Sequence, residues 1–284
     1  QRNGLSKSIS NKSPSKTACN AAKAHDNDSP EYTCYSEDQL LKMKMKWNER
    51  HPDAKIVASD KKGIWTALHK HNAKACNKES CWIEQEFMKH HLDDQFKRHT
   101  FAPKQPKKWG KNPVEWLTST DISEVMQQYE HRYKDYEFIG PAPIDFDTKK
   151  GANKCVWDEL CNFSVADCLN RGKYRIGIIF NTDPHYKPGS HWIALYIDLR
   201  ANRNYVYFFD SNGDECPEQI NILRKRIIKQ AAESSISLQY KHNIGTEHQM
   251  ENTECGMYCL YFITTLISGK HGPDAFTGKR IPDK

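Results

Sequence analysis

The sequence predicts an α+β protein in which a mainly helical region precedes a β-sheet flanked by helices. In residues 37–98 apolar and charged residues are mixed at helical intervals, whereas residues 174–209 contain three short apolar runs rich in β-branched and aromatic residues. At 284 residues, the chain is long enough for one substantial domain and a smaller region beside it.

The first part of the chain divides into an arm and a small helical region. Residues 1–36 are rich in Ser, Asn, Lys and Ala and contain almost no large apolar side chains, so they bury too little surface to offset the entropy of ordering. We therefore expect a flexible arm there and a mainly helical accessory region over residues 37–108. Near its end, Phe101–Pro113 contains three prolines and four lysines, which disfavour regular structure and predict a linker. The main domain is expected to span residues 109–284.

The main domain is predicted to begin with a helix after Trp116. Its apolar positions repeat on one helical face: Ile122, Val125, Met126 and Tyr129. Ser and Thr residues directly before this face can cap the helix.

Strands and helices then follow in a defined order. Three apolar runs are predicted to be strands: Tyr174–Phe180, His191–Leu199 and Tyr205–Phe209. The last two are separated by a short segment with two turn-forming asparagines, which predicts a hairpin. The remaining elements are a helix over Ile220–Ala231, a short strand over Ile236–Tyr240 and a strongly apolar helix over Cys255–Ser268.

Composition excludes several classes of function. The net charge of +6 comes from 42 basic and 36 acidic residues, an excess too small to indicate a dedicated nucleic-acid binder. No apolar run approaches the length of a membrane-spanning helix, and the start of the sequence lacks a basic segment followed by an apolar one. We therefore expect no membrane partner and no secretion. There is no Gly-rich phosphate loop and no His-Glu-x-x-His segment, so we expect no cofactor.

The ten cysteines show no repeated pairing pattern and are few for a disulfide scaffold of this length, so free thiols in a reducing compartment are expected. Zinc is an alternative at Cys76 and Cys81, because four histidines lie near them in the sequence. No second close pair of ligands completes the spacing of a structural zinc site, and we expect none.

Three residues with reactive side chains fall at the ends of predicted elements. His191 begins a strand and Asp210 follows its hairpin partner, so antiparallel pairing can bring the imidazole and the carboxylate together. Cys255 begins a helix, where free backbone amides and the helix dipole favour a thiolate. Each residue alone is more typical of a buried or solvated structural position. Their joint placement predicts nucleophilic catalysis by the Cys255 thiol.

The sequences around these residues resemble a known family. The segments are Gly189-Ser-His-Trp192, Phe208-Phe-Asp-Ser-Asn212 and Gln249-Met-Glu-Asn-Thr-Glu-Cys-Gly256. They are similar to the cysteine proteases of the SUMO-protease and adenain group, and in particular to the viral polyprotein proteases of the African swine fever virus type. The resemblance covers roughly Trp109 to Ile281. It implies a papain-like core with a central mixed β-sheet flanked by helices.

The resemblance also implies a role for each site residue. His191 corresponds to the general base, Asp210 to the residue that orients it and Cys255 to the nucleophile. Gln249 corresponds to the oxyanion-hole amide, although Asn252 stands where the swine fever virus type carries Gln. Gln249 is the better match of the two.

Two tryptophans are implied to form a narrow cleft. Trp192 corresponds to the family residue that covers a tunnel for a Gly-Gly segment, and Trp116 to its opposite wall. Such a cleft selects glycine by steric exclusion. The expected reaction is therefore cleavage after Gly-Gly, in a viral structural polyprotein or, as the alternative, in a ubiquitin-like modifier of the SUMO or ubiquitin type.

Other functions remain open at this point. An acetyltransferase of similar residue order is disfavoured because those enzymes lack the tryptophan after the histidine. An inactive binding module is disfavoured because all four site residues are present. The resemblance to adenovirus enzymes leaves DNA or a peptide open as a weak activator.

Overall fold

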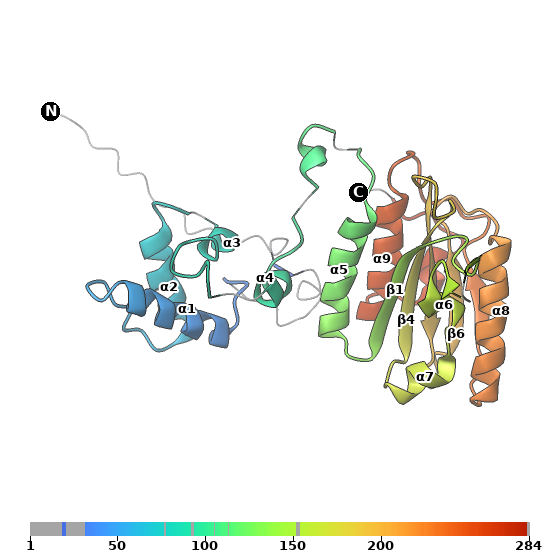
Figure 1. Ribbon diagram of the computed structural model, residues 1–284, viewed down its shortest axis with the longest axis horizontal. Coiled ribbons are helices and arrows are strands. Elements are labelled where there is room, and N and C mark those ends of the chain that lie inside the picture. The colour runs from blue at the N-terminus through green and yellow to red at the C-terminus, as the bar shows by residue number, and fades with distance from the viewer. Residues whose placement is uncertain are drawn as a thin grey trace. The chain divides into compact units, whose positions relative to one another are not determined.

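The computed structural model describes residues 19–20, 32–76, 78–91, 94–104, 106–112, 114–151 and 154–282. The chain divides into two compact units, Gln1–Ala102 and Pro103–Lys284, and each is described by itself (Figure 1).

The first unit is helical, as its sequence predicts. Its helices are α1 (Glu37–Arg50), α2 (Lys61–Asn72), α3 (Glu79–Trp82) and α4 (Asp94–Thr100). Helix α1 begins at a capping box in which Ser36 and Gln39 each accept a hydrogen bond from the backbone of the other, and α2 begins at Asp60, which accepts from the Gly63 amide. The apolar faces of α1 and α2 pack into one core around the buried indole of Trp82.

The prediction of a flexible arm over residues 1–36 is wrong for the residues that are described there. Cys19 and Asn20 are buried, and Cys19 pairs with Phe101 in an isolated β-bridge. Cys34 is also buried and forms a disulfide with Cys19, across Cα atoms 5.1 Å apart. The composition of this stretch did not predict its order, because a disulfide can hold a segment in place without a large apolar side chain. Residues 1–18 and 21–31 of the predicted arm lie outside the described residues.

The expectation of free thiols is also wrong for six of the ten cysteines. Besides Cys19–Cys34, the structure joins Cys76 to Cys81 and Cys155 to Cys161, with Cα separations of 6.0 and 6.3 Å. The spacing of the ten cysteines in the sequence did not predict these pairs. The free cysteines are Cys168, Cys216, Cys255 and Cys259.

The second unit is built on a mixed sheet. Its strands are β1 (Tyr136–Pro143), β2 (Lys149–Lys150), β3 (Lys154–Cys155), β4 (Arg175–Asn181), β5 (Trp192–Asp198), β6 (Tyr205–Phe209) and β7 (Gln239–His242). Its helical segments are η3 (Lys107–Gly110), α5 (Ser119–Arg132), α6 (Asp158–Cys161), α7 (Val165–Asn170), α8 (Glu218–Glu233), α9 (Cys255–Ser268) and η4 (Pro273–Phe276). The five-stranded sheet has the order β1-β4-β5-β6-β7.

Both parallel and antiparallel pairs occur in this sheet, which confirms the predicted fold class. Strands β4, β5 and β6 are antiparallel neighbours, whereas β1 and β7 each join an edge in parallel. Helices α5 and α9 cover one face and α8 covers the other (Figure 1). All seven residues of β5 are buried, so this strand and the helix α9 against it form the rigid centre of the unit.

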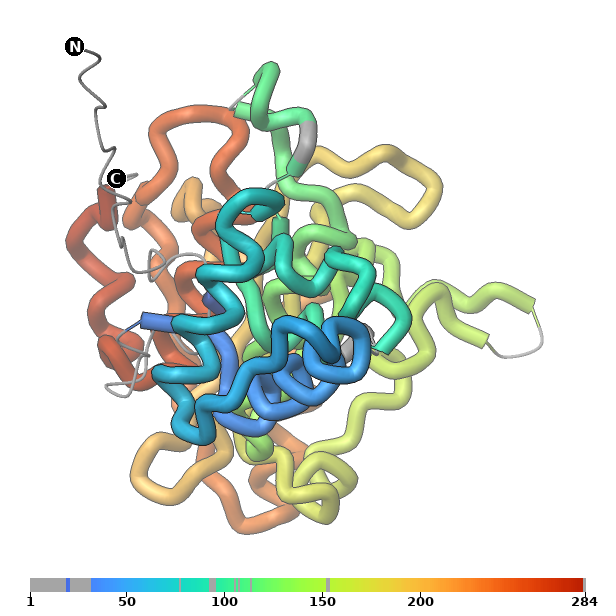
Figure 2. The backbone as a smooth tube through the Cα atoms, turned by 90° about the vertical axis from the view of Figure 1, so that its left-hand side faces the viewer, coloured from blue at the N-terminus to red at the C-terminus, as the bar shows by residue number. Residues whose placement is uncertain are grey.

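The predicted strands and helices of this unit are present, although the last strand lies at Gln239–His242 and not at Ile236–Tyr240. Several elements were not predicted, namely η3, β1, β2, β3, α6, α7 and η4. The helix over Cys255–Ser268 has the bounds that the sequence predicted. Strand β1 was not predicted, because its sequence contains a glycine and two prolines. The short hairpin of β2 and β3 was also not predicted, and it projects from the unit at the right of Figure 2. Among the described residues, no helix has the length and apolar character needed to cross a membrane.

Candidate active site

The hairpin of β5 and β6 brings His191 and Asp210 together, as predicted. His191 directly precedes β5, Asp210 directly follows β6, and the two strands pair in antiparallel register. The His191 Nε2 atom lies 2.8 Å from Asp210 Oδ1. The carboxylate is 5% exposed and the imidazole 17% exposed, so the pair is shielded from water on most sides. A carboxylate at this distance fixes the orientation and tautomer of the ring.

Asp210 is itself held in place by its neighbours. The backbone amide of Asn212 donates a hydrogen bond to Asp210 Oδ1 at 2.8 Å. The side chain of Asn243, which follows β7, accepts from the Asp210 amide at 3.0 Å and donates to the Asp210 carbonyl. Asn243 is fully buried. The Asn212 amide therefore holds the carboxylate toward His191, and Asn243 fixes the backbone that carries it.

Cys255 is the first residue of α9 and is almost completely buried. No side chain caps this helix, so the amides of its first turn are not satisfied by a capping group. The partial positive charge at a helix N-terminus stabilises a thiolate. The thiol also lies within hydrogen-bonding reach of His191.

The electrostatics of His191 follow from these contacts. Burial alone lowers the pKa of His191, but its hydrogen bonds to Asp210 and Cys255 and the negative charge on both partners outweigh burial and raise the pKa to about 10. The imidazolium is therefore the favoured form near neutral pH. Since Nε2 faces the carboxylate, Nδ1 is the atom left for the thiol.

Gln249 is tied to the strand that carries Asp210. Its backbone amide donates to the Ser211 carbonyl at 3.0 Å, and its side-chain oxygen accepts from the Ser211 hydroxyl at 2.8 Å. Its side-chain nitrogen donates to the carbonyl of Glu251. That bond uses one of two amide hydrogens, which leaves the second for another acceptor. Gln249 is buried whereas Asn252 is exposed, which favours Gln249 as the fixed amide of this loop.

Trp192 connects the histidine to the helix that carries the cysteine. Its indole Nε1 donates to the Leu117 carbonyl at 3.1 Å. A Cβ added to Gly256 would lie 3.2 Å from both Trp192 Cδ1 and Leu117 Cβ. Glycine at this position therefore lets the indole and Leu117 pack directly against the start of α9.

Both predicted tryptophans line one cavity. The cavity has a volume of about 570 Å³, and its walls include Trp116, Trp192, Pro143 and Gly189. Trp116 is half-buried, so part of its indole faces the opening. His191 and Cys255 do not line the cavity themselves. Trp192 connects the cavity with the His191 and Cys255 side chains, because it follows His191 in the sequence and packs against Gly256, the neighbour of Cys255.

Comparison with known proteins assigns the chain to a family. Residues 173–282 match the Ulp1 protease family, C-terminal catalytic domain. A thiol protease of Acanthamoeba polyphaga mimivirus is 30% identical over 263 residues, which cover 86% of this chain and 83% of that protein. The chain belongs to the Ulp1 protease family of cysteine peptidases.

Relatives from a second virus extend the match. Cysteine proteases of two African swine fever virus isolates are each 24% identical over 228 residues, which cover 76% of this chain and 82% of theirs, and one is named a SUMO-1 cysteine protease. The crystal structure of a protease from this virus superposes with a TM-score of 0.62 and 20% identity, covering 95% of this chain and 92% of that one. The protease described here therefore shares that fold.

Sequence reasoning missed several residues that support this site. Asn243 and Leu117 carry no chemical signature, since an amide or an apolar side chain in a loop is common. His248, next to Gln249, is fully buried and was not singled out either. Gly256 belongs to the segment that resembles the family, but its sequence context did not indicate why a glycine is needed there. Among the described residues, no cluster of His, Cys, Asp and Glu side chains could hold a metal ion.

Proposed function

We propose that this protease cleaves protein substrates after a Gly-Gly segment, with Cys255 as the nucleophile, His191 as the acid and base, Asp210 as the residue that orients His191 and Gln249 as an oxyanion donor. The observation that carries the proposal is the His191–Asp210 hydrogen bond, with the Cys255 thiol within hydrogen-bonding reach of the same imidazole. Residues 109–284, which lie within the unit Pro103–Lys284, are the proposed protease core, and residues 37–108 are the proposed accessory region.

The proposed chemistry follows from the charges in the site. The Cys255 thiolate attacks the carbonyl carbon of the scissile bond, and the negative charge moves to the carbonyl oxygen. The imidazolium of His191 then donates its proton to the leaving amine, which leaves an acyl-enzyme. A water molecule, deprotonated by the neutral imidazole, releases the acid product. Backbone amides at the start of α9 and the second amide hydrogen of Gln249 are suited to stabilise the oxyanion.

Glycine selection is proposed on steric grounds. Trp192 is fixed over Gly256 by its hydrogen bond to the Leu117 carbonyl, and it shares a cavity with Trp116. A substrate chain that passes between two indoles has no room for side chains next to the cleaved bond. A viral structural polyprotein is the favoured substrate, acted on in the virion or the host cytoplasm. A ubiquitin-like modifier is the second candidate, because a relative is named a SUMO-1 cysteine protease.

Peptide cleavage tests the proposal. The substrates are a peptide with a central Gly-Gly-Ala and a matched peptide with Ala-Ala-Ala. We expect cleavage after Gly-Gly alone, loss of cleavage in Cys255→Ala and a decrease of about 10²–10³-fold in Gln249→Ala. The control is Cys216→Ala, because Cys216 is a free, partly exposed cysteine whose thiol interacts with Pro217 and Tyr240.

The same assay separates the alternatives. Cleavage that survives Cys255→Ala would exclude the thiol mechanism. Cleavage of both peptides at equal rates would exclude glycine selection but retain the mechanism. A folded protein that processes SUMO-type precursors and leaves polyprotein fragments intact would make the modifier the substrate. Transfer of acetyl from acetyl-coenzyme A without any peptide cleavage would assign the site to acyl transfer instead.

A further inference from the structure

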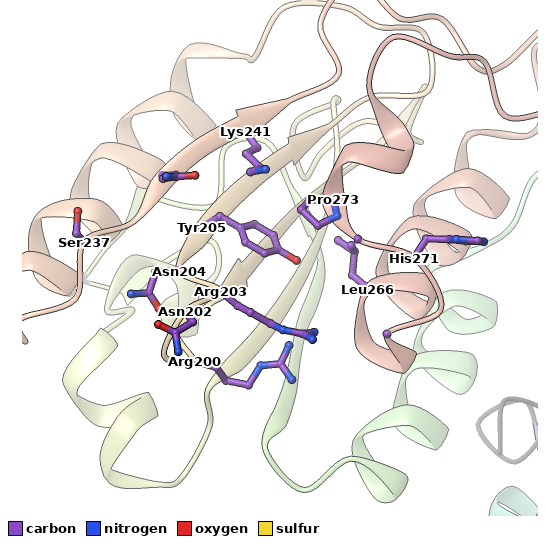
Figure 3. A pocket seen from close by; sticks show the side chains of 13 residues that line it. Arg200, Asn202, Arg203, Asn204, Tyr205, Ser237, Lys241, Leu266, His271 and Pro273 are labelled. Atoms are coloured by element: carbon purple, nitrogen blue, oxygen red, sulfur yellow. The ribbon is translucent and has the colours of Figure 1, made fainter. Parts of the chain in front are cut away.

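A second cavity in the same unit has no part in the proposed reaction. It has a volume of about 650 Å³ and lies between the β5–β6 turn, strand β7 and the segment that follows α9. Figure 3 shows the side chains of the 13 residues that line it. None of them is Asp or Glu, whereas Arg200, Arg203, Lys241 and His271 are among them. Such a wall attracts anions.

The cationic side chains of this cavity differ in whether they already form hydrogen bonds or ion pairs. In the part of the chain that the structure describes, the Arg203 guanidinium forms no hydrogen bond and no ion pair, and its side chain is exposed. Lys241 pairs with Asp274 at 2.7 Å, but that carboxylate is 87% exposed. An ion pair with so exposed a partner contributes little and exchanges readily. Arg203 and Lys241 are therefore available to a ligand.

Arg200 is fixed rather than free, which makes it a prepared part of the wall. Its Nε and Nη2 atoms donate to Asp198 at 2.9 and 2.6 Å. Asp198 is fully buried, is paired with Arg200 and does not line the cavity. Two of the five guanidinium N–H donors are occupied, which leaves three for a ligand.

Tyr205 supplies a neutral donor at the centre of this group. Burial and the charge of Asp198 raise the pKa of the Tyr205 hydroxyl, while the charges of Arg200 and Arg203 act on the same hydroxyl to lower it. The hydroxyl therefore keeps its proton. In Figure 3 the Tyr205 hydroxyl and the guanidinium ends of Arg200 and Arg203 turn toward the same space, with Lys241 at the opposite side.

The cavity lies far from the proposed active site. His191 precedes β5 and Cys255 begins α9, whereas Arg200 follows the other end of β5 and Gly269 the other end of α9. Seven strand residues and 14 helix residues separate the two places. At about 3.3 Å per strand residue and 1.5 Å per helix residue, that is on the order of 20 Å. A ligand here does not compete with the substrate at Cys255.

We propose that this cavity is a binding site for a small, multiply charged phosphate anion, held by Arg200, Arg203 and Lys241. Arginine and lysine together suit several phosphate oxygens, and the tyrosine hydroxyl adds a neutral donor. A small anion is favoured over a nucleic-acid chain because the cationic groups gather around one hollow instead of forming a stripe along the surface. The net charge of only +6 agrees with this choice.

Calorimetric titration with inorganic tripolyphosphate tests this site. The test variant is Arg203→Gln with Lys241→Gln. The control is Lys225→Gln with Lys229→Gln, because both lysines are exposed on α8, form no part of the cavity wall and change the net charge equally. We expect one tripolyphosphate per chain, binding weakened roughly 10-fold or more in the test variant and less than about 2-fold in the control. Among the described residues the Arg203 guanidinium has no partner to lose, and Lys241 loses only its ion pair with the exposed Asp274, so this variant should fold.

Several outcomes of the titration would overturn the proposed anion site. Absence of tripolyphosphate binding to the wild type overturns the proposal, as does equal weakening in both double variants, because that is the signature of unspecific attraction. Single-stranded DNA that binds through the same two residues and is not displaced by tripolyphosphate would assign the site to a nucleic acid instead. Peptide cleavage is not the readout, so the result is independent of the proposed protease mechanism.

Discussion

The side chain of Asn243 forms two hydrogen bonds with the backbone of Asp210, one to its amide at 3.0 Å and one to its carbonyl. Both residues are buried, so neither bond is exchanged with water at little cost. Asn243 reaches Asp210 from the end of β7, and in this way the parallel edge strand determines where the carboxylate faces His191.

Substitution Asn243→Ala should therefore reduce catalysis without touching a reacting group. The loss of both bonds leaves the buried Asp210 amide unpaired, whereas the Asp210 carbonyl keeps its hydrogen bond from the Gly213 amide. The unpaired amide should lower the free energy of unfolding by about 1–3 kcal/mol. Displacement of Asp210 should lower kcat/KM about 10- to 100-fold. Urea unfolding and peptide cleavage measure the two effects. Asn170→Ala, at an exposed asparagine, is the control, and equal effects of the two variants would contradict the proposed positioning role.

The raised pKa of His191 predicts the pH dependence of cleavage. The pKa is raised to about 10, so the imidazolium needed to protonate the leaving amine is lost only as the pH rises through about 10. Asp210→Asn removes one of the negative charges that raise this pKa. We expect the alkaline limb of kcat/KM to move to lower pH and the rate to fall about 10²-fold or more. An alkaline limb that stays in place would show that Asp210 does not set the pKa of His191.

The same shift predicts how stability depends on pH. Because the folded pKa of His191 is above its unfolded value of about 6.5, the charged pair stabilises the fold fully below that pH, and the stabilisation is lost as the pH rises through about 10. The difference in unfolding free energy between wild type and Asp210→Asn should therefore shrink between pH 7 and pH 10.5. Urea titrations at these two pH values measure it. A difference that grows with pH would have the wrong sign.

Gly256 offers a test of the proposed tryptophan wall. In Gly256→Ala the new Cβ would lie 3.2 Å from Trp192 Cδ1 and from Leu117 Cβ, closer than most such contacts, so the indole or Leu117 must shift. We expect kcat/KM for the Gly-Gly peptide to fall about 10-fold, since misplacement of a binding wall costs this much or more. Gly110→Ala is the control, because no atom lies within 4 Å of the added Cβ. Equal rates in the two variants would remove Trp192 from the substrate site.

The fold was predictable where a short run of residues determines an element. The helix over Cys255–Ser268 is apolar throughout and ends at Gly269, which adopts the left-handed conformation, so its limits could be derived from the sequence. Strand β1 could not, because it is held by parallel pairing with β4 and not by its own composition. The disulfide of Cys19 and Cys34 was missed for a similar reason, since no sequence rule brings those two residues together.

The candidate site shows the same division. His191 and Asp210 could be predicted to meet because a hairpin places strand ends side by side. The residues that hold them could not, since Asn243 comes from the end of a different strand and Leu117 from the segment before α5. Supporting contacts of this kind depend on packing between distant parts of the chain, and a single sequence carries no signal for them.

His248 provides a final prediction, because its buried ring connects the Gln249 loop to the last described segment. Nε2 donates to the Phe276 carbonyl at 3.1 Å, and Nδ1 accepts from the Ile281 amide at 3.0 Å, which requires the neutral ring. Burial lowers the pKa of His248, and the nearby Arg280 lowers it further, against the opposing effect of the Phe276 carbonyl. Protonation would place an N–H of the ring against the N–H of Ile281.

The lowered pKa means that His248 stabilises the fold fully above its unfolded value of about 6.5 and progressively less as the pH falls below it, since the unfolded chain then binds more protons. His248→Phe should lower the free energy of unfolding by about 1–3 kcal/mol at pH 7.5, because Phe276 and Ile281 lose their partner. The difference from wild type should be smaller at pH 5. His271→Phe, at an exposed histidine, should show neither effect in the same urea titrations. A difference that is unchanged between the two pH values would mean that the ring does not titrate in this range, and that its role is packing against Phe209 and Tyr258 alone.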